Sequence, residues 1–272
     1  MTIIKDIINQ NKRLSDIAEV IADLSEEIKV PTFLVGGCVR DLMLNPGLNS
    51  TDIDIMVEGD GIQFAQLLSN RLGVKKIVPF PKFATAKIPY KECEIEVASA
   101  RLETYDKSSR SPSSITLADI KDDLMRRDFR VNAMAVSLNK YNYGEFIDPF
   151  KGLDDLRDKI LRTPLDPDST FSDDPLRMVR AAYFASKLSL EINEECLVSM
   201  QRNCQRIKIV SQERITNELF KILGTDKPSI GLDILQKAGL LEFVFNEIAI
   251  MYGLDQSNEY HHKDIFYHTL EV

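Results

Sequence analysis

The chain has 272 residues, 44% of them hydrophobic, which is enough to bury one large core or two of ordinary size. A formal net charge of −8 and a pI of about 5.1 exclude a generic nucleic-acid coat protein, which would be basic overall. No apolar run approaches the ~18 residues of a membrane span, and the four cysteines show no paired spacing, so we expect reduced thiols and a cytoplasmic protein.

The first half of the chain is expected to alternate helices and strands. Polar residues at helical spacing predict one amphipathic helix over residues 3–28. After it we expect a strand over 32–37, a short helix over 38–44, a strand over 52–59, a helix over 61–73 and a three-stranded meander over 75–80, 83–89 and 93–100.

The second half is expected to be mostly helical. The polar, serine-rich segment 101–118 is interpreted as a mobile loop, and the segment 129–138 as one helix rich in small residues. A last strand and turn over 144–150 precede helices at about 172–188, 192–203, 212–223 and 228–238. These patterns predict an α+β protein with a mixed sheet and flanking helices, followed by an all-helical part from about residues 150–165 onward.

Two aspartates, Asp52 and Asp54, flank Ile53 in the second predicted strand. Residues two apart on a strand point to the same face, so both carboxylates project together while Ile53, Ile55 and Val57 face the core. Two carboxylates this close repel each other unless a cation lies between them, and such oxygen ligands suit Mg²⁺ with substrate phosphates. The alternative is a strand edge with two solvated acids, which a lone D-x-D pattern favours.

A pair of glycines precedes this strand. Gly36 and Gly37 lie at a strand-to-helix turn, where the backbone comes close to a ligand and the amides of a helix start attract phosphate. Arg40, one turn into that helix, is able to pair with a phosphate. The glycines alone are equally typical of a tight turn, but turn, arginine and acid pair together favour a phosphate site. Glu96, on a neighbouring predicted strand, is a further ligand, a base or a solvated residue.

Two further polar clusters lie downstream. The first places Asp128 as the N-cap of the helix predicted over 129–138, and its members are Arg126, Arg127, Asp128 and Asn132. It is either a capped helix with exposed arginines or a clamp for a triphosphate and ribose. The second places Asp174 near an N-cap, with Arg177 on the same face and Arg180 continuing it. A cap with an ordinary surface ion pair is the alternative there.

Five separate motifs carry a family resemblance: LVGGCVRDLML with DIDIMV, RRDFRVNAMA, DPFKGLDDL, DDPLRMVRAAYFASKL and SQERITNELFKIL. In this order they resemble the class II tRNA nucleotidyltransferases, which are the CCA-adding enzymes, and the related bacterial poly(A) polymerases. The resemblance covers about residues 30–225. It implies a nucleotidyltransferase head over 1–158 and a helical neck and body with a base-recognition helix over 159–250. Residues 251–272 resemble the start of a further helical region, of the HD type in some members, which we expect to be truncated.

The resemblance also implies roles for individual residues. Asp52 and Asp54 would bind the catalytic metals. Glu96 is added to them as a candidate catalytic residue because of its position on the neighbouring predicted strand. The nucleotide-binding residues that it implies are Gly37, Arg40, Arg127, Asp128, Asp174, Arg177 and Arg180. The clusters around them add Gly36, Arg126 and Asn132 as candidates. Of the implied residues, Asp174 and Arg177 would read the incoming base. That pair suits cytosine and adenine, because each base offers an amino donor beside a ring-nitrogen acceptor, whereas Asp only accepts and Arg only donates hydrogen bonds.

We therefore expect addition of CCA to the tRNA 3′ end from CTP and ATP by a two-metal displacement. Two Mg²⁺ ions ~3.5–4 Å apart would bridge Asp52, Asp54 and the triphosphate. The nearest alternatives are a poly(A) polymerase or an enzyme that adds only CC or only A. An alternative of another class is a non-catalytic RNA-binding module. We expect no membrane partner, and the motifs carry no information on oligomeric state.

Overall fold

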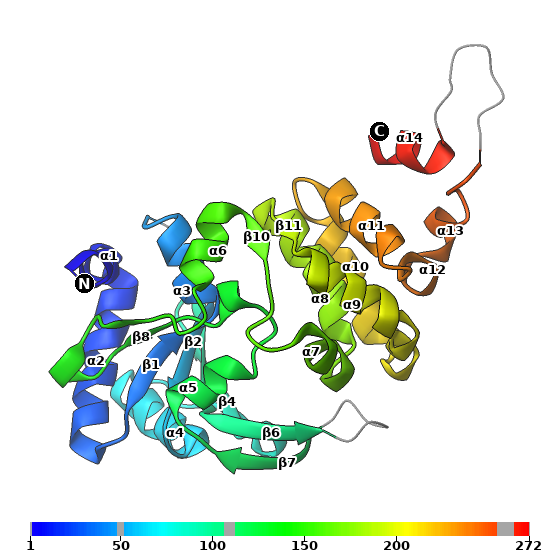
Figure 1. Cartoon of the computed structure of the whole chain (residues 1–272). Helices are drawn as coiled ribbons and strands as arrows, with labels where there is room; N and C mark the ends of the chain where they lie inside the picture. The colour runs from blue at the N-terminus through cyan, green and yellow to red at the C-terminus, as the bar shows by residue number, and fades with distance from the viewer. Residues whose placement is uncertain (1, 48–51, 106–111, 255–263, 272) are drawn as a thin grey trace. The chain divides into compact units, whose positions relative to one another are not determined.

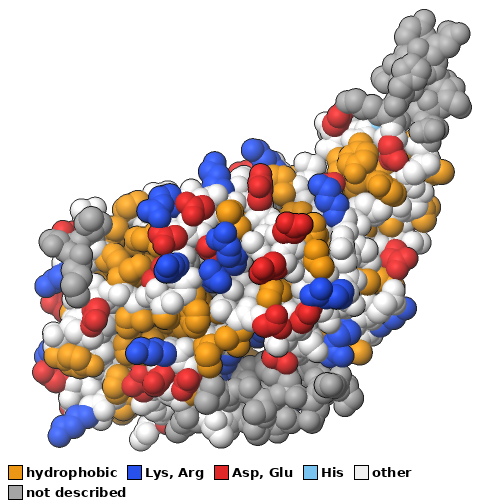
Figure 2. Space-filling view, viewed as in Figure 1, with side chains coloured by type: hydrophobic (Ala, Val, Ile, Leu, Met, Phe, Trp, Pro, Cys, Tyr) orange, Lys and Arg blue, Asp and Glu red, His pale blue; other side chains and the backbone are white. Residues whose placement is uncertain are grey.

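The computed structural model describes residues 2–47, 52–105, 112–254 and 264–271 (Figure 1). The chain divides into two compact units, which are treated separately below. The head unit comprises Met1–Thr104 with Ser114–Asp154, and the helical unit comprises Tyr105–Ser113 with Asp155–Val272. In the space-filling view acidic and basic side chains are intermixed (Figure 2), so the net charge of −8 is not gathered into one patch on the face shown there.

The head unit begins with two helices, α1 (Thr2–Gln10) and α2 (Lys12–Ile28). The single helix predicted over 3–28 is therefore wrong at Asn11. The backbone of Asn11 is extended, and its side-chain oxygen accepts a hydrogen bond from the Leu14 amide at 3.1 Å, so Asn11 ends one helix and caps the next.

A mixed sheet of seven strands forms the centre of the head unit (Figure 1). The strand order is β3-β4-β5-β2-β1-β8-β9, and only the β2–β5 pair is parallel among the pairings described. The strands are β1 (Thr32–Val35), β2 (Asp52–Val57), β3 (Val78–Phe80), β4 (Thr85–Tyr90), β5 (Cys93–Ser99), β8 (Ala135–Ser137) and β9 (Phe146–Ile147). The meander β3-β4-β5 confirms the three strands predicted over 75–100.

The two faces of the sheet have different covers. Helix α2 and helix α4 (Gly61–Arg71), which is capped by Asp60, pack on one face. On the other face Phe33, Val35 and Met56 form a core cluster with Leu124 of helix α5 (Ile120–Met125). Because strand residues alternate between faces, Asp52 and Asp54 share the face of Met56 and lie beyond the edge of that cluster. Helix α3 (Gly37–Leu44) follows β1 directly.

The helix predicted over 129–138 is absent from this described segment. Residues Arg130–Asn132 form a single 3₁₀ turn, η2, and Ala135–Ser137 form β8, which pairs antiparallel with Phe33–Val35 of β1. Ala and Met favour helices in isolation, but pairing with the free side of β1 outweighs that preference. Asp128 therefore caps no helix there. Two more 3₁₀ turns occur at Pro81–Phe83 (η1) and Lys140–Asn142 (η3).

The loop predicted over 101–118 is also wrong in part. Strands β6 (Arg101–Tyr105) and β7 (Pro112–Leu117) form a separate two-stranded sheet. The serine-rich composition predicted irregular structure. A polar segment can nevertheless form a strand when cross-strand side-chain pairs stabilise it. Residues 106–111, at the centre of the predicted loop, lie outside the described residues.

The helical unit is built around helix α8 (Leu176–Leu188), which packs against α10 (Gln212–Leu223) and α11 (Pro228–Lys237). Gly231 allows the close approach of α11, because a Cβ there would lie 2.7 Å from Ile222 and 2.9 Å from Ser186 Oγ. The remaining elements up to α13 are α6 (Gly152–Asp158), β10 (Ile160–Leu161), α7 (Pro167–Asp173), β11 (Glu191–Ile192), α9 (Glu194–Asn203), η4 (Cys204–Ile209), α12 (Leu241–Val244) and α13 (Asn246–Ala249). Helix α6 crosses the boundary between the units.

The last described element is α14 (Ile265–Glu271), which carries His268. His261 and His262 lie outside the described residues, so the predicted HD-type start is not described as a whole. Among the helices of the described ranges, none is both long and apolar enough to cross a lipid bilayer.

Candidate active site

The two predicted metal ligands lie on β2, beside a row of charged side chains. In the parallel register Asp52 is opposite Glu94 and Asp54 is opposite Glu96 on β5. Across the next pair, Lys87 of β4 is opposite Glu96. The Lys87 ammonium group lies 2.5 Å from Glu94 Oε1 and 3.6 Å from Glu96 Oε2. The sheet therefore places Glu96 on the strand beside Asp54, as predicted from the sequence. It also places the positively charged Lys87 in this row, which the sequence analysis did not predict.

Asp54 lies in an environment that disfavours its charged form. Burial raises its pKa to about 6; Arg127 acts in the opposite direction, whereas Glu96 and Asp52 add to the rise. Asp52, by contrast, is exposed at the start of the strand. A half-buried carboxylate with a raised pKa beside two further acids is a place where a cation would relieve repulsion.

The glycine turn lies directly beside this carboxylate. Gly36 has a φ of 72° and precedes α3. A Cβ added at Gly36 would lie 2.7 Å from Arg127 Nη1 and 3.6 Å from Asp54 Oδ2. The missing side chain therefore leaves room where the glycine turn, Asp54 and Arg127 converge, all within the head unit.

Arg126 and Arg127 share one carboxylate but point to different places. Asp123 of α5 is 1% exposed, and its Oδ1 accepts from Arg126 Nε at 3.1 Å while its Oδ2 accepts from Arg127 Nη2 at 3.0 Å. Burial pushes the pKa of Asp123 upward, but Arg127 and Arg126 outweigh it and hold the pKa below its usual value. Arg126 also donates to the Arg101 carbonyl at 3.0 Å, so it is directed toward β6 rather than toward Asp54.

Three other predicted residues form one buried network. Arg40 donates to Asn132 Oδ1, and Asn132 Nδ2 donates to Asp128 Oδ1 at 3.0 Å. Asp128 Oδ1 also accepts from the Phe129 amide at 2.8 Å. The Arg40 side chain is 3% exposed and contacts Asp41 as well, so its present contacts hold α3 against the η2 turn. The structure brings these residues together, and their contact with a nucleotide stays a prediction.

In the helical unit, Asp174 lies between α7 and α8. Its Oδ1 accepts from the Leu176 amide at 3.2 Å, which caps the start of α8, and its Oδ2 lies 3.7 Å from Arg214 Nη2 on α10. Arg177 follows in the first turn of α8 and donates to the Thr170 carbonyl at 3.4 Å. The Arg177 amide donates to the Asp174 carbonyl at 3.0 Å, so the two residues adjoin at the start of α8, and Asp174 lies next to the N-cap residue Pro175. Their contact with a base stays a prediction.

Arg180, one turn further along α8, faces a different group. Its guanidinium lies 3.9 Å from Glu218 Oε1 of α10 and 5.2 Å from the centroid of the Phe184 ring. Glu218 is 5% exposed and also binds Lys221 at 2.7 Å. Arg180 thus takes part in packing α8 against α10.

The carboxylates of Asp52 and Asp54 fit a divalent ion whose remaining ligands come from substrate phosphates and water. Among the residues the structure describes, no group of three or more His, Cys, Asp or Glu side chains is arranged to hold a metal. Asp52 and Asp54 alone supply two carboxylates, and Mg²⁺ is typically bound by one or two carboxylates together with substrate phosphates and water. Glu96 is paired with Lys87, which makes a direct ligand role for Glu96 less favourable than a role in shaping the charge of the site.

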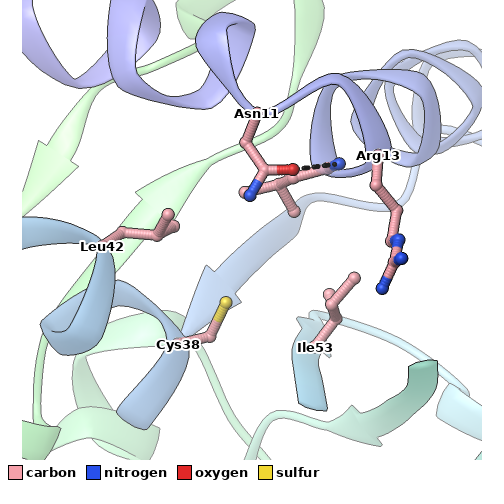
Figure 3. Close-up of a pocket in the computed structure, with 6 residues that line it drawn as sticks. Asn11, Arg13, Cys38, Leu42 and Ile53 are labelled. Atoms are coloured by element: carbon pink, nitrogen blue, oxygen red, sulfur yellow. Dashed lines mark hydrogen bonds between the residues drawn. The ribbon is translucent and has the colours of Figure 1, made fainter. Parts of the chain in front are cut away.

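The small pocket shown in Figure 3 is not this site. It is lined by Asn11, Arg13, Leu14, Cys38, Leu42 and Ile53, and has room for about one water molecule. Ile53 alternates with the two aspartates along β2, so the pocket lies on the opposite face of the sheet.

Comparisons with known proteins agree with this geometry. A mixed sheet with a carboxylate pair beside a glycine turn and an arginine defines a nucleotidyltransferase-type head. Residues 32–162 match the family model described as "Poly A polymerase head domain", and residues 189–251 match "Probable RNA and SrmB- binding site of polymerase A". The chain belongs to the family of enzymes formed by the class II tRNA nucleotidyltransferases and the bacterial poly(A) polymerases.

The relatives include enzymes with two different names. The chain is 38% identical to the A-adding tRNA nucleotidyltransferase of Aquifex aeolicus over 84% of its own length and 28% of the relative. It is 32% identical to the CCA-adding enzyme of Pediococcus pentosaceus over 83% of its length and 54% of the relative. A tRNA nucleotidyltransferase solved with a primer tRNA and an incoming ATP analogue matches with a TM-score of 0.71 and 31% identity, over 85% of this chain and 66% of that one. The chain thus spans only part of these relatives.

Proposed function

We propose that the chain transfers nucleotidyl groups from CTP and ATP to the 3′ end of tRNA. The single observation that carries the proposal is the convergence of Asp54, Gly36 and Arg127 in the head unit. A carboxylate that can hold a cation, a guanidinium that can bind phosphate and a backbone without a side chain meet there. A triphosphate with its bound cation needs all three kinds of group. The family membership and the tRNA–ATP-analogue complex of a relative support the choice of substrate. A cytoplasmic location, where tRNA is processed, is part of the proposal.

In this proposal each side chain of the head unit has a separate task. Asp52 and Asp54 would hold Mg²⁺, which when bound lowers the barrier by activating the RNA 3′-hydroxyl and stabilising the pyrophosphate that leaves. Arg127 would neutralise phosphate charge from the side of α5, because its Nη1 points to the glycine turn. The Gly36 backbone would come close to the triphosphate because no Cβ fills the space.

Base selection is assigned to the helical unit. Asp174 would accept a hydrogen bond from the amino group of cytosine or adenine, and Arg177 would donate to the neighbouring ring nitrogen. Uracil and guanine present a carbonyl where Asp174 needs a donor. Leaving a buried polar group without its partner costs on the order of 1–3 kcal/mol, so both bases would be rejected.

A-only addition is a second candidate. The relative of Aquifex aeolicus, at 38% identity, is named an A-adding enzyme, whereas the CCA-adding relative is 32% identical. The Asp174–Arg177 pair serves both bases equally, so it does not separate the two activities.

Extension of tRNA that lacks its 3′ end tests the proposal. Substrates that lack the whole CCA end, that already end in CC and that carry the complete CCA are each supplied with CTP, ATP or both. CCA addition predicts that CTP and ATP together complete the shortest substrate. A-only addition predicts that ATP extends only the substrate that already ends in CC. No extension of any substrate with Mg²⁺ present would contradict the proposed function.

A further inference from the structure

Asp123 is a buried carboxylate that neither the motifs nor the predicted site included. It lies in the middle of the short helix α5, and its side chain is 1% exposed. Its neighbour Leu124 belongs to the core cluster on that face of the sheet. A lone charge in such a place is costly, and replacing buried ion pairs by apolar residues is often neutral or stabilising. The fold alone therefore gives little reason for a charge at this position.

Each oxygen of Asp123 is assigned to one arginine. Oδ1 accepts from Arg126, which is also hydrogen-bonded to the Arg101 carbonyl and so has a second contact of its own. Oδ2 accepts from Arg127 Nη2 at 3.0 Å and from Arg127 Nε at 3.3 Å. These two bonds occupy one edge of the Arg127 guanidinium and leave Nη1, which makes a 3.4 Å bond to the Asn132 carbonyl, beside Gly36.

The two-point contact fixes a side chain that would otherwise move. A free arginine samples many rotamers, and a planar guanidinium held along one edge loses most of that freedom before any ligand arrives. The remaining nitrogen, Nη1, then lies beside the position that a Cβ of residue 36 would occupy. That position is 3.6 Å from Asp54 Oδ2.

We propose that Asp123 is a positioning residue for the triphosphate: it acts through Arg127, whose guanidinium it holds at the glycine turn. This inference rests on the proposed function, because it assigns Asp123 to the phosphate side of the same site. The ligand is a nucleoside triphosphate, and the number of its phosphates decides how much Asp123 contributes.

Nucleotide binding without turnover separates this role from a role in the core alone. ATP and AMP affinities are measured with Mg²⁺ and without RNA for the wild-type chain, Asp123→Asn, Arg127→Met and the double variant. Asp155→Asn is the matched control, because Asp155 is also buried, at 3% exposed, and pairs with Arg162 at 2.5 Å. Thermal unfolding of every variant reports loss of stability separately. If Asp123→Asn does not fold, Asp123→Glu replaces it, since the longer side chain keeps the charge and displaces Arg127.

We expect Asp123→Asn to weaken ATP binding at least tenfold and AMP binding less than twofold, while Asp155→Asn leaves the ratio of the two affinities unchanged. The double variant should bind ATP within twofold of Arg127→Met, because both changes remove the same contact. Losses of the two single variants that multiply, or an unchanged ATP-to-AMP ratio in Asp123→Asn, would overturn the inference and leave the proposed function intact. A wild-type chain that binds no ATP with Mg²⁺ would contradict the proposed function, and this inference with it.

Discussion

Asp54 is a carboxylate that folding moves out of water and toward two other acids. Its pKa rises from 3.8 to about 6, with burial as the largest cause. Because this pKa is higher in the folded than in the unfolded chain, the folded chain binds more protons between these two values. The free energy of unfolding therefore decreases as the pH rises through that window, and the loss is complete above it. A cation held at the carboxylates would offset the loss at neutral pH.

We expect Asp54→Asn to raise the midpoint of thermal unfolding by about 2–4 °C near pH 7.5 in the absence of divalent ions, and to leave it unchanged near pH 4. Added Mg²⁺ should raise the midpoint of the wild-type chain but not that of the variant. Scanning fluorimetry at both pH values checks this, with Asp226→Asn as an exposed control. Equal stabilisation at both pH values would show that the effect does not come from the charge.

The positive charge of Lys87 affects how strongly the site can bind a cation. It neutralises Glu94 and Glu96, and the positive charge also opposes a cation at the neighbouring Asp54. Lys87→Met should therefore tighten binding of Mn²⁺, used as a probe for Mg²⁺, by about three- to tenfold in titration calorimetry. Lys140→Met is the matched control, because Lys140 also bridges two carboxylates, Asp23 and Glu26 of α2. Similar Mn²⁺ affinities in the wild type and Lys87→Met would contradict the charge argument.

The turn from β1 to α3 is predicted to tolerate no side chain at Gly36. Gly36 and Gly73 both have a φ of 72°, but a Cβ at Gly73 would meet nothing within 4 Å, whereas one at Gly36 would collide with Arg127. Both Gly→Ala variants should lose roughly 1 kcal/mol or more of stability from backbone strain. Only Gly36→Ala should also weaken ATP binding, by at least tenfold in the same equilibrium titration. If Gly73→Ala weakened it equally, the loss would be due to strain and not to the site.

The sequence predicted the elements whose local pattern and tertiary setting agree. The alternation of DIDIMV placed Asp52 and Asp54 on one face of β2, and α4 (Gly61–Arg71) lies within the helix predicted over 61–73. It did not predict β8, because Ala135–Ser137 are extended only through pairing with β1. The break at Asn11 was missed because the apolar periodicity continues through it, although Asn before a helical pattern is a cap signal.

The candidate site was predictable where motifs are local and not where it depends on pairing. Lys87 reaches Glu96 only through the β4–β5 register, and single-sequence patterns do not determine which residues of two strands are opposite. Asp123 had one usable signal, a carboxylate four residues before Arg127, and that i,i+4 spacing is common in surface ion pairs. Its burial, which gives it its proposed role, follows from the packing of α5 on the sheet.

At the level of the whole molecule, we assign phosphate chemistry to the head unit and base choice to the helical unit. Changes at the two sites should therefore differ in kind. Arg127→Met should reduce incorporation of CTP and ATP by similar factors. Asp174→Ala should reduce the preference for CTP and ATP over UTP and GTP by about tenfold or more, because it removes the acceptor that rejects a carbonyl. Competition assays with all four nucleotides measure both, and a changed base preference in Arg127→Met would contradict this division.

The role of Asp52 and Asp54 as metal ligands is tested by single-nucleotide incorporation with Asp52→Ala. Asp52 is exposed at the start of β2, so its removal should leave the unfolding midpoint within about 2 °C of the wild type. With a tRNA that accepts one nucleotide, saturating nucleotide and Mg²⁺, we expect the rate to fall at least a thousandfold in a chain that remains folded. Incorporation by Asp52→Ala at the rate of the wild type would contradict this role.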